Sequence, residues 1–305
     1  DGVPLLQASA TIIDYKTGQV KVLIGGRGNQ PSASLNRAYF DLKSIGSTTK
    51  PLTVYGPAID TKLITAGTPL DDTSVSEEIL EKYNFGSVVP KNADGSMFGY
   101  ITAREALTYS KNLTSIKTVD MLGLDTALNY GKKAGLKYAP QSHTMSALAL
   151  GQFDQPIGNR DGGNTTILAS AYGAFGNNGV IYEPALYTKV EDASGNLLLE
   201  KEPISTKLFS PQTSYIIYDI LKGSSTSAQF NDIPVAGKTG TTNSSDNFWF
   251  AGLTPYYSGS VWIGYDNPQR MNGRSSSAAS LFSKIMAVAH EGLEYKDIEK
   301  PSGLV

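Results

Sequence analysis

The stretch DNFWFAGLTPYYSGSVWIGYD (residues 246–266) contains two runs rich in aromatic and β-branched residues, separated by a turn with proline and glycine. This pattern predicts a β-hairpin. Near the other end of the chain, ASATIIDYKTGQVKVLIGG (residues 8–26) predicts a second hairpin that turns at DYKTGQ. DIPVAGKTGTT (residues 232–242) predicts a further short strand. The simplest arrangement pairs these strands from both ends of the chain in one antiparallel sheet.

Helical patterns occupy the middle of the chain, and one more follows the hairpin at 246–266. They are TAREALTYSKN (102–112), NTTILASAYGAFGNNG (164–179), SPQTSYIIYDILKG (210–223) and an amphipathic segment at about 277–291. The first has a capping box of Thr102 with Glu105, the second a threonine cap, and the third a serine cap followed by proline and closed by glycine. We expect an α/β protein of the α+β type, in which helices cover the sheet and a mainly helical lobe adjoins it. A ligand site is expected in the cleft between the two.

The expected organisation is a single domain over residues 1–305. Its sheet lobe would comprise about 1–45 and 230–292, its helical lobe about 46–229, and a polar tail 293–305. With 305 residues, 40% of them hydrophobic, the chain can bury a substantial core. Because it begins with Asp1 and not methionine, we expect a piece of a longer protein, with any membrane anchor outside it.

Composition excludes several classes of function. Lys and Arg number 26 against 28 Asp and Glu, so no excess of positive charge indicates a nucleic-acid partner. The absence of cysteine and the presence of only His143 and His290 argue against a metal site or another cofactor. A P-loop reading of Gly237-Lys238-Thr239 fails because position 232 is aspartate. A serine nucleophile, if present, would more readily use lysine than histidine as its base.

SIGSTTKPLT (residues 44–53) places Ser47 three residues before Lys50 and Pro51. If a helix begins near Ser47, this spacing puts both side chains on one face. Two interpretations remain open from these residues alone. Ser47 could cap a helix beside a solvated lysine, or it could be a nucleophile whose proton a desolvated Lys50 accepts.

Two further patterns are weak when taken singly. Ser110-Lys111-Asn112 is one of several Ser-x-Asn triplets, and Lys238-Thr239-Gly240 repeats the triplet at 16–18 in the turn of the hairpin at 8–26. The second Lys-Thr-Gly follows a strand. Its side chains could line a cleft while its glycine admits a ligand close to the backbone.

In this order, Ser47-x-x-Lys50, Ser110-x-Asn112 and Lys238-Thr239-Gly240 resemble the three signature motifs of penicillin-binding proteins and serine β-lactamases. The flanks ATIIDYKTGQVKVLIGG, SLNRAY, GSTTKPLTVYGPAID, ILASAYGAFGNNGVIYEPA and GKTGTTNSSDNFWFAGLTPYYSGSVWIGYD resemble the transpeptidase domain of class A penicillin-binding proteins. The likeness runs over nearly the whole chain. It favours the nucleophile interpretation of Ser47.

The resemblance implies a role for each matching residue. Ser47 would attack the penultimate D-alanine of a peptidoglycan stem peptide, with Lys50 as its base. Ser110 would relay a proton to the leaving nitrogen, and Asn112 would hold the substrate amide and Lys50. Lys238 would keep Lys50 neutral and attract the terminal carboxylate.

Substrate binding is implied for the residues that follow Lys238. Thr239 and Thr241 hydroxyls would bond the carboxylate, and Gly240 lies between them. The backbone amides of Ser47 and Thr241 would form the oxyanion hole. No metal takes part.

The resemblance also separates related activities. Class A β-lactamases use a glutamate after the Ser-x-Asn motif to activate water, but no glutamate occurs here between Asn112 and Glu183. The aspartates in that interval lack the family's Glu-x-x-x-Asn context; they are Asp120, Asp125, Asp154 and Asp161. Slow deacylation is therefore expected, with β-lactam antibiotics forming long-lived adducts.

The leading interpretation is a D,D-transpeptidase that cross-links stem peptides ending in D-Ala-D-Ala. The full-length protein would be anchored at the extracytoplasmic face of a bacterial membrane, with a glycosyltransferase domain and cell-wall synthesis partners. A D,D-carboxypeptidase shares every site residue and remains an alternative. A non-enzymatic penicillin sensor is a further alternative, although the flanking segments match class A enzymes more specifically.

Overall fold

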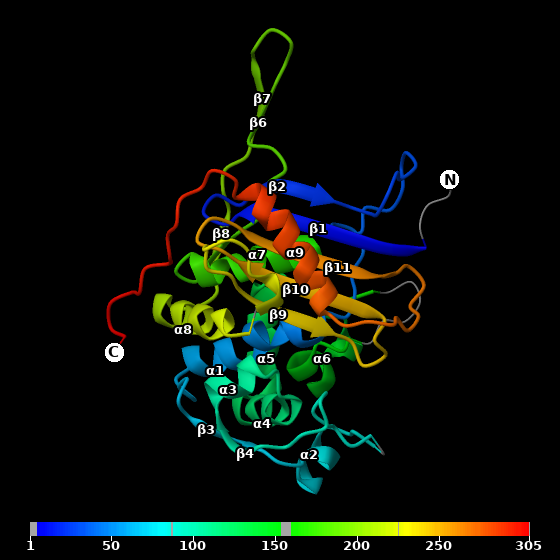
Figure 1. The fold of residues 1–305 in the computed structure, drawn as a ribbon, viewed down its shortest axis with the longest axis vertical. Coiled ribbons are helices and arrows are strands. Elements are labelled where there is room, and N and C mark those ends of the chain that lie inside the picture. The colour runs from blue at the N-terminus through cyan, green and yellow to red at the C-terminus, as the bar shows by residue number, and fades with distance from the viewer. Residues whose placement is uncertain (1–4, 87, 154–159, 225, 305) are drawn as a thin grey trace.

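The computed structural model describes residues 5–86, 88–153, 160–224 and 226–304. Its main feature is a five-stranded antiparallel sheet of order β2-β1-β11-β10-β9 (Figure 1). The strands are β1 (Leu6–Asp14), β2 (Gln19–Ile24), β9 (Ala236–Thr241), β10 (Asn247–Leu253) and β11 (Ser258–Tyr265). The two expected hairpins and the additional strand are therefore confirmed, as is the sheet built from both ends of the chain.

The centre of the sheet joins the two ends directly. β1 pairs with β11 in an antiparallel register that runs from Leu6 opposite Tyr265 to Ile13 opposite Ser258. β10 then pairs with both β11 and β9. This order leaves β9, which carries Lys238, at one edge of the sheet.

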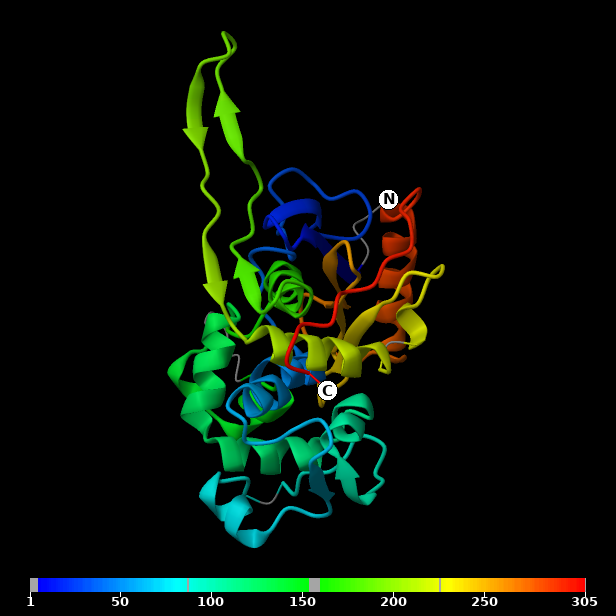
Figure 2. The ribbon, with the colours of Figure 1, turned by 90° about the vertical axis from the view of Figure 1, so that its left-hand side faces the viewer.

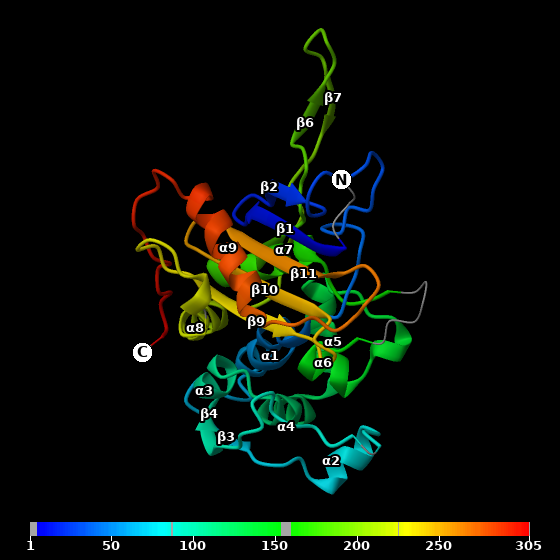
Figure 3. The ribbon, with the colours of Figure 1, turned by 45° about the vertical axis from the view of Figure 1, so that its right-hand side comes forward.

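Helices cover both faces of the sheet. α9 (Ser276–Ala289) crosses one face of the sheet (Figures 1 and 3). The rings of Phe250 and Phe282 lie 4.7 Å apart there. α7 (Thr165–Gly173) packs on the opposite face, against β1, β10 and β11. The expectation that the closing helix covers the sheet is confirmed. α7 belongs to the middle of the chain, yet it packs on the sheet.

The other helices lie mainly below β9 in Figure 1. They are η1 (Gly46–Thr49), η2 (Pro51–Tyr55), α1 (Gly56–Asp60), α2 (Glu77–Lys82), α3 (Ala103–Thr108), α4 (Asn112–Leu122), α5 (Leu124–Lys133), η3 (Pro140–Ser142), α6 (Met145–Leu150), η4 (Ala174–Gly176), α8 (Pro211–Lys222) and η5 (Thr226–Ala228). The exceptions are η4, which directly follows α7, and η5, which packs on α9. In the described part of the chain, none of the helices has the length and apolar character needed to cross a bilayer.

Three two-stranded sheets complete the described elements. They pair β3 (Pro69–Asp72) with β4 (Gly99–Thr102), β5 (Val180–Tyr182) with β8 (Ser205–Lys207), and β6 (Lys189–Glu191) with β7 (Leu197–Glu200). The β6–β7 hairpin projects away from the body (Figure 2). All residues of its two strands are exposed.

Local capping explains where several helices begin. Thr102 and Glu105 form the expected reciprocal capping box of α3, and Ser210 caps α8 ahead of a proline. For α7 the expected threonine cap is wrong, because Asn164 accepts the Ile167 N–H at 2.9 Å. The threonines that follow Asn164 instead use their hydroxyls in contacts to β1 and to the segment before η1.

Phe250 offers a test of how the sheet is held. Phe250→Ala should lower the free energy of unfolding by about 3–5 kcal/mol, because the buried ring leaves a cavity against α9. Val288→Ala, at an exposed position of the same helix, should change it by less than about 0.5 kcal/mol. Urea unfolding measures both, and equal effects would contradict this account of the core.

Candidate active site

Ser47 lies in η1, a 3₁₀ helix that begins at Gly46, and Lys50 follows directly. In a 3₁₀ helix the residues i and i+3 eclipse, so Ser47 and Lys50 stand on one side of the turn. Ser47 is partly exposed, whereas Lys50 is completely buried. The turn therefore carries a partly exposed serine and a completely buried lysine on one side.

The helical run after Lys50 is not a regular α-helix. η2 is a π-helix that begins at Pro51, and α-helical geometry starts only at Gly56. Thr53 contributes to this irregularity, because its hydroxyl bonds the carbonyls of Thr49 at 3.0 Å and Leu148 at 2.6 Å. π-turns inside helices occur frequently at functional sites.

Glycines let η1 approach its neighbours closely. Gly46 has a φ of +55°, and a Cβ there would lie 2.5 Å from the Thr241 carbonyl oxygen. A Cβ at Gly240 would lie 2.4 Å from the Ile45 carbonyl oxygen. A Cβ at Gly151 would lie 2.1 Å from the Gly46 carbonyl oxygen. The absence of side chains at Gly46 and Gly240 therefore lets the backbone of the Ser47 turn lie directly against the end of β9.

The Ser-x-Asn triplet surrounds the amine of Lys50. Lys50 Nζ donates to the Ser110 carbonyl and to Asn112 Oδ1, both at 2.7 Å, and to the Lys111 carbonyl at 3.2 Å. The Ser110 hydroxyl is 3.4 Å away. Among the described residues no hydrogen bond joins Lys50 to the Ser47 hydroxyl; such catalytic bonds often tighten only when substrate is present.

The pKa values of the two site lysines are lowered. Burial first, and then the positive charge of Lys238, hold the pKa of Lys50 well below its usual value, against the opposing charge of Asp72. Burial lowers the pKa of Lys238 to about 8. The direction agrees with the expectation that Lys238 favours a neutral Lys50.

β9 presents the remaining predicted residues at the sheet edge. Because side chains alternate along a strand, Lys238 and Gly240 share the face that packs on η1, and Thr239 and Thr241 share the other. Thr239 is partly exposed and Thr241 is exposed. The outer edge of β9 has no partner among the described strands, so an extended ligand can pair there.

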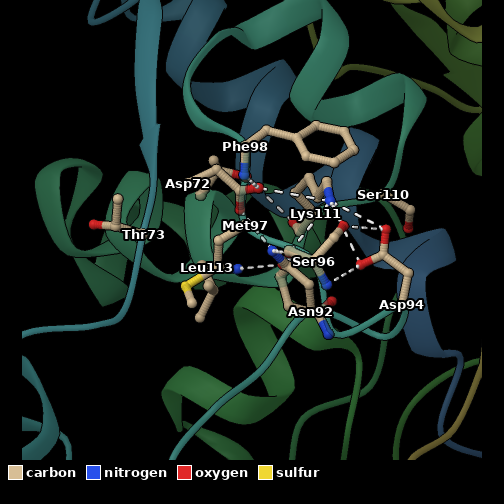
Figure 4. Close-up of polar contacts among 12 residues, drawn as sticks. Asp72, Thr73, Asn92, Asp94, Ser96, Met97, Phe98, Ser110, Lys111 and Leu113 are labelled. Atoms are coloured by element: carbon tan, nitrogen blue, oxygen red, sulfur yellow. Dashed lines mark hydrogen bonds and ion pairs between the residues drawn. The ribbon is translucent and has the colours of Figure 1, made fainter.

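Sequence reasoning missed a polar cluster on the other side of Ser110. Asp72, Asn92 and Lys111 are buried there, and Asp94 bonds Lys111 from the surface (Figure 4). These residues, apart from Lys111, come from the segment 71–96, which contains none of the three motifs. The sequence feature that could have indicated this cluster is Lys111, a lysine that lies between the motif residues Ser110 and Asn112.

The aspartates considered as water activators have other positions. Asp120 bonds Lys82 at 2.7 Å, Asp125 lies exposed in the first turn of α5, and Asp161 accepts the Ala139 N–H. Asp154 lies outside the described residues.

The histidines fit structural roles. His290 is buried at the end of α9, where its ring nitrogens contact the Thr254 hydroxyl at 2.8 Å and the Met286 carbonyl at 2.7 Å. His143 is exposed in the segment before α6. Neither lies in the cluster around Lys50.

Comparison with known proteins identifies the family. Residues 8–287 match the family model described as the penicillin binding protein transpeptidase domain. The chain therefore belongs to this family of penicillin-binding transpeptidase domains. It is 54% identical to a penicillin-binding protein 1A of Clostridium perfringens, over 100% of this chain and 37% of that protein, and 34% identical to one from Neisseria gonorrhoeae, over 99% and 38%.

Solved structures share the fold. Penicillin-binding protein 1A from Haemophilus influenzae matches with a TM-score of 0.81 at 21% identity, over 99% of this chain and 50% of that one. PonA1 from Mycobacterium tuberculosis, in complex with penicillin V, matches at 0.79 and 20%, over 100% and 83%. The D,D-transpeptidase domain of a peptidoglycan glycosyltransferase from Eggerthella lenta matches at 0.74 and 19%, over 94% and 79%. The chain spans less than half the length of the curated relatives named above.

The lowered pKa of Lys238 predicts a pH-dependent stability. Between about pH 8, its folded value, and its unfolded value of 10.5, the unfolded chain binds more protons, so the free energy of unfolding rises with pH. Lys238→Met lacks this contribution. Between pH 7.5 and 9.5 the wild type should therefore gain about 1–2 kcal/mol relative to the variant.

Urea unfolding at the two pH values measures this difference. Lys284→Met, which removes an exposed lysine of α9, is the control and should follow the wild type. A difference between wild type and Lys238→Met that stays constant with pH would contradict the lowered pKa.

Proposed function

We propose that this chain is a serine-type D,D-transpeptidase domain, which cross-links peptidoglycan stem peptides through an acyl-enzyme on Ser47 and is trapped covalently by β-lactams. One observation carries the proposal. Lys50, buried and with a lowered pKa, stands one 3₁₀ turn after a partly exposed Ser47. A neutral amine there can accept the serine proton at ordinary pH.

In the acylation step Ser47 Oγ attacks the carbonyl carbon of the penultimate D-alanine while Lys50 takes its proton. The backbone amides of Ser47 and Thr241 stabilise the oxyanion of the tetrahedral intermediate, where losing one donor typically costs about 2.7–4 kcal/mol. The carbon–nitrogen bond then breaks. The Ser110 hydroxyl, 3.4 Å from Lys50 Nζ, passes the proton to the departing amine of D-alanine.

Substrate binding follows from the open edge of β9. An extended stem peptide can pair with the free peptide groups of this strand. Its terminal carboxylate is attracted by Lys238, on the face of β9 toward η1, and meets the hydroxyls of Thr239 and Thr241, on the other face, at the open edge of the strand. Asn112 donates its second amide hydrogen to the substrate.

Deacylation transfers the acyl group to an amine of a neighbouring strand, which forms a peptide bond and frees Ser47. Rapid hydrolysis would need a carboxylate that activates water. Asp120 is ion-paired with Lys82, and Asp161 bonds a backbone amide. These engagements favour slow hydrolysis and hence a long-lived penicillin adduct.

The wider context is also a proposal. The Eggerthella lenta relative is described as the transpeptidase domain of a peptidoglycan glycosyltransferase, and the curated relatives are more than twice as long as this chain. We infer that the complete protein carries a glycosyltransferase domain and a membrane anchor. It would act at the extracytoplasmic face of a bacterial membrane with other cell-wall synthesis proteins.

Labelling with a fluorescent penicillin tests the nucleophile and the base. The wild type should form a covalent adduct that persists after excess drug is removed, and Ser47→Ala should form none. Lys50→Ala should remain folded yet acylate about 100-fold more slowly or worse, because its general base is missing. Covalent labelling of Ser47→Ala would eliminate Ser47, and an unchanged rate in Lys50→Ala would eliminate the base.

Product analysis distinguishes transfer from hydrolysis. With a stem peptide ending in D-Ala-D-Ala and an acceptor amine, we expect the acceptor-linked product and free D-alanine. Mass spectrometry of the mixture measures both. Hydrolysis alone would instead favour the carboxypeptidase alternative, which uses the same residues.

A further inference from the structure

Lys111, the middle residue of the Ser-x-Asn triplet, is held in a buried polar cluster that the proposed chemistry does not use. Its side chain is 1% exposed. Nζ bonds Ser96 Oγ at 2.7 Å and Asp94 Oδ2 at 3.1 Å, lies 3.6 Å from Asp72 Oδ2, and sits 3.6 Å above the centre of the Phe98 ring (Figure 4). A cation buried with two carboxylates fixes this turn to the segment between β3 and β4.

Asn92 in that segment caps α4 from a distance along the chain. Its Oδ1 accepts the N–H groups of Asn112 at 2.7 Å and Leu113 at 3.2 Å. Its Nδ2 donates to Asp72 Oδ1 at 2.7 Å and to the Ser96 carbonyl at 2.8 Å. The residue at the cap position of α4 supplies no capping side chain of its own, so Asn92 satisfies the orphan amides.

The same segment orients the groups that meet Lys50. The Lys91 carbonyl accepts from Asn112 Nδ2 at 2.9 Å, which turns Asn112 Oδ1 toward Lys50 Nζ at 2.7 Å. Ser110 has a φ of +59°, a left-handed conformation that is strained for a serine. That conformation directs its carbonyl at Lys50, 2.7 Å away. The anchors on both sides of Lys111 hold this strained turn.

We propose that Asp72, Asn92 and Lys111 are positioning residues for acylation, which fix the Ser110 and Asn112 groups against the amine of Lys50. This inference rests on the proposed function. The three residues touch neither the substrate nor Ser47. They act by keeping the turn between α3 and α4 in its one productive conformation, and so Asp72 and Asn92 support the active site from outside it.

Asn92→Ala tests the proposal through the kinetics of acylation by a fluorescent penicillin. Stopped-flow measurement separates the dissociation constant of the non-covalent complex from the limiting acylation rate constant. We expect this rate constant to fall about tenfold or more, equivalent to about 1.4 kcal/mol in the barrier. The fraction of protein finally labelled should stay complete. A limiting rate constant equal to that of the wild type would overturn the proposal.

The control removes a cap in the same segment but away from the site. Ser76→Ala deletes the side chain that caps α2 through the Ile79 N–H, and its limiting rate constant should equal that of the wild type. A reduced labelled fraction with an unchanged rate constant in Asn92→Ala would show a structural role alone and would also overturn the proposal.

A second pair keeps the test valid should Asn92→Ala fail to fold. Asp94 is half-exposed, so Asp94→Asn leaves the buried residues in place while weakening the anchor of Lys111; it should lower the rate constant severalfold. Lys117 in α4 forms an ion pair with Asp71 of β3 at 2.8 Å. Lys117→Met removes this ion pair and should leave the limiting rate constant unchanged. A wild-type rate constant in Asp94→Asn argues against positioning. Failure of the wild type to acylate would instead overturn the proposed function.

Discussion

The site depends on backbone meeting backbone where the Ser47 turn touches the end of β9. Gly46 and Gly240 each leave room for a neighbouring carbonyl that a methyl group would displace. Backbone atoms of the turn and of β9 therefore meet directly, and side-chain bonds from Trp249 to the Ser44 carbonyl and from Tyr172 to the Thr48 carbonyl hold the turn in addition. A shift of β9 would move Lys238 away from Lys50 and weaken the electrostatic effect on its pKa.

Three buried lysines lie near this contact, and they differ in whether a carboxylate pairs with them. Lys111 is balanced by Asp72 and Asp94 and makes an anchor. Lys50 and Lys238 have no ion pair with a carboxylate among the described residues, and burial lowers the pKa of each. Proximity alone would give three cations that repel one another. The carboxylates lie beside Lys111 only, whereas burial lowers the pKa of Lys50 and of Lys238.

Local sequence patterns predicted the parts of the fold that depend on near neighbours. Runs of aromatic and β-branched residues predicted the hairpins, and short-range caps predicted the starts of α3 and α8. The spacing of Ser47 and Lys50 also implied a shared face. For α7 the prediction of a threonine cap was wrong, since the better-placed acceptor was Asn164 and the threonines were used by tertiary contacts.

What could not be predicted depends on residues distant in sequence. The π-turn after Lys50 reflects a bond from Thr53 to Leu148, which no local propensity contains. Asn92 caps a helix that begins at Asn112, beyond any capping pattern. The surroundings of Lys111 likewise come from another segment. These are the interactions by which tertiary structure overrides local preference.

The pairing of β1 with β11 has a consequence for how the chain acquires its fold. Leu6 must meet Tyr265, so the central sheet cannot close until nearly all of the chain is present. Closing so long a loop carries an entropic cost before any contact compensates for it, which slows folding. Until then the β1–β2 hairpin leaves the edge of β1 that pairs with β11 unpaired. The helices between β1 and β11 lie within the loop that this pairing closes. We therefore expect Lys238 to meet Ser47 and Lys50 late in folding.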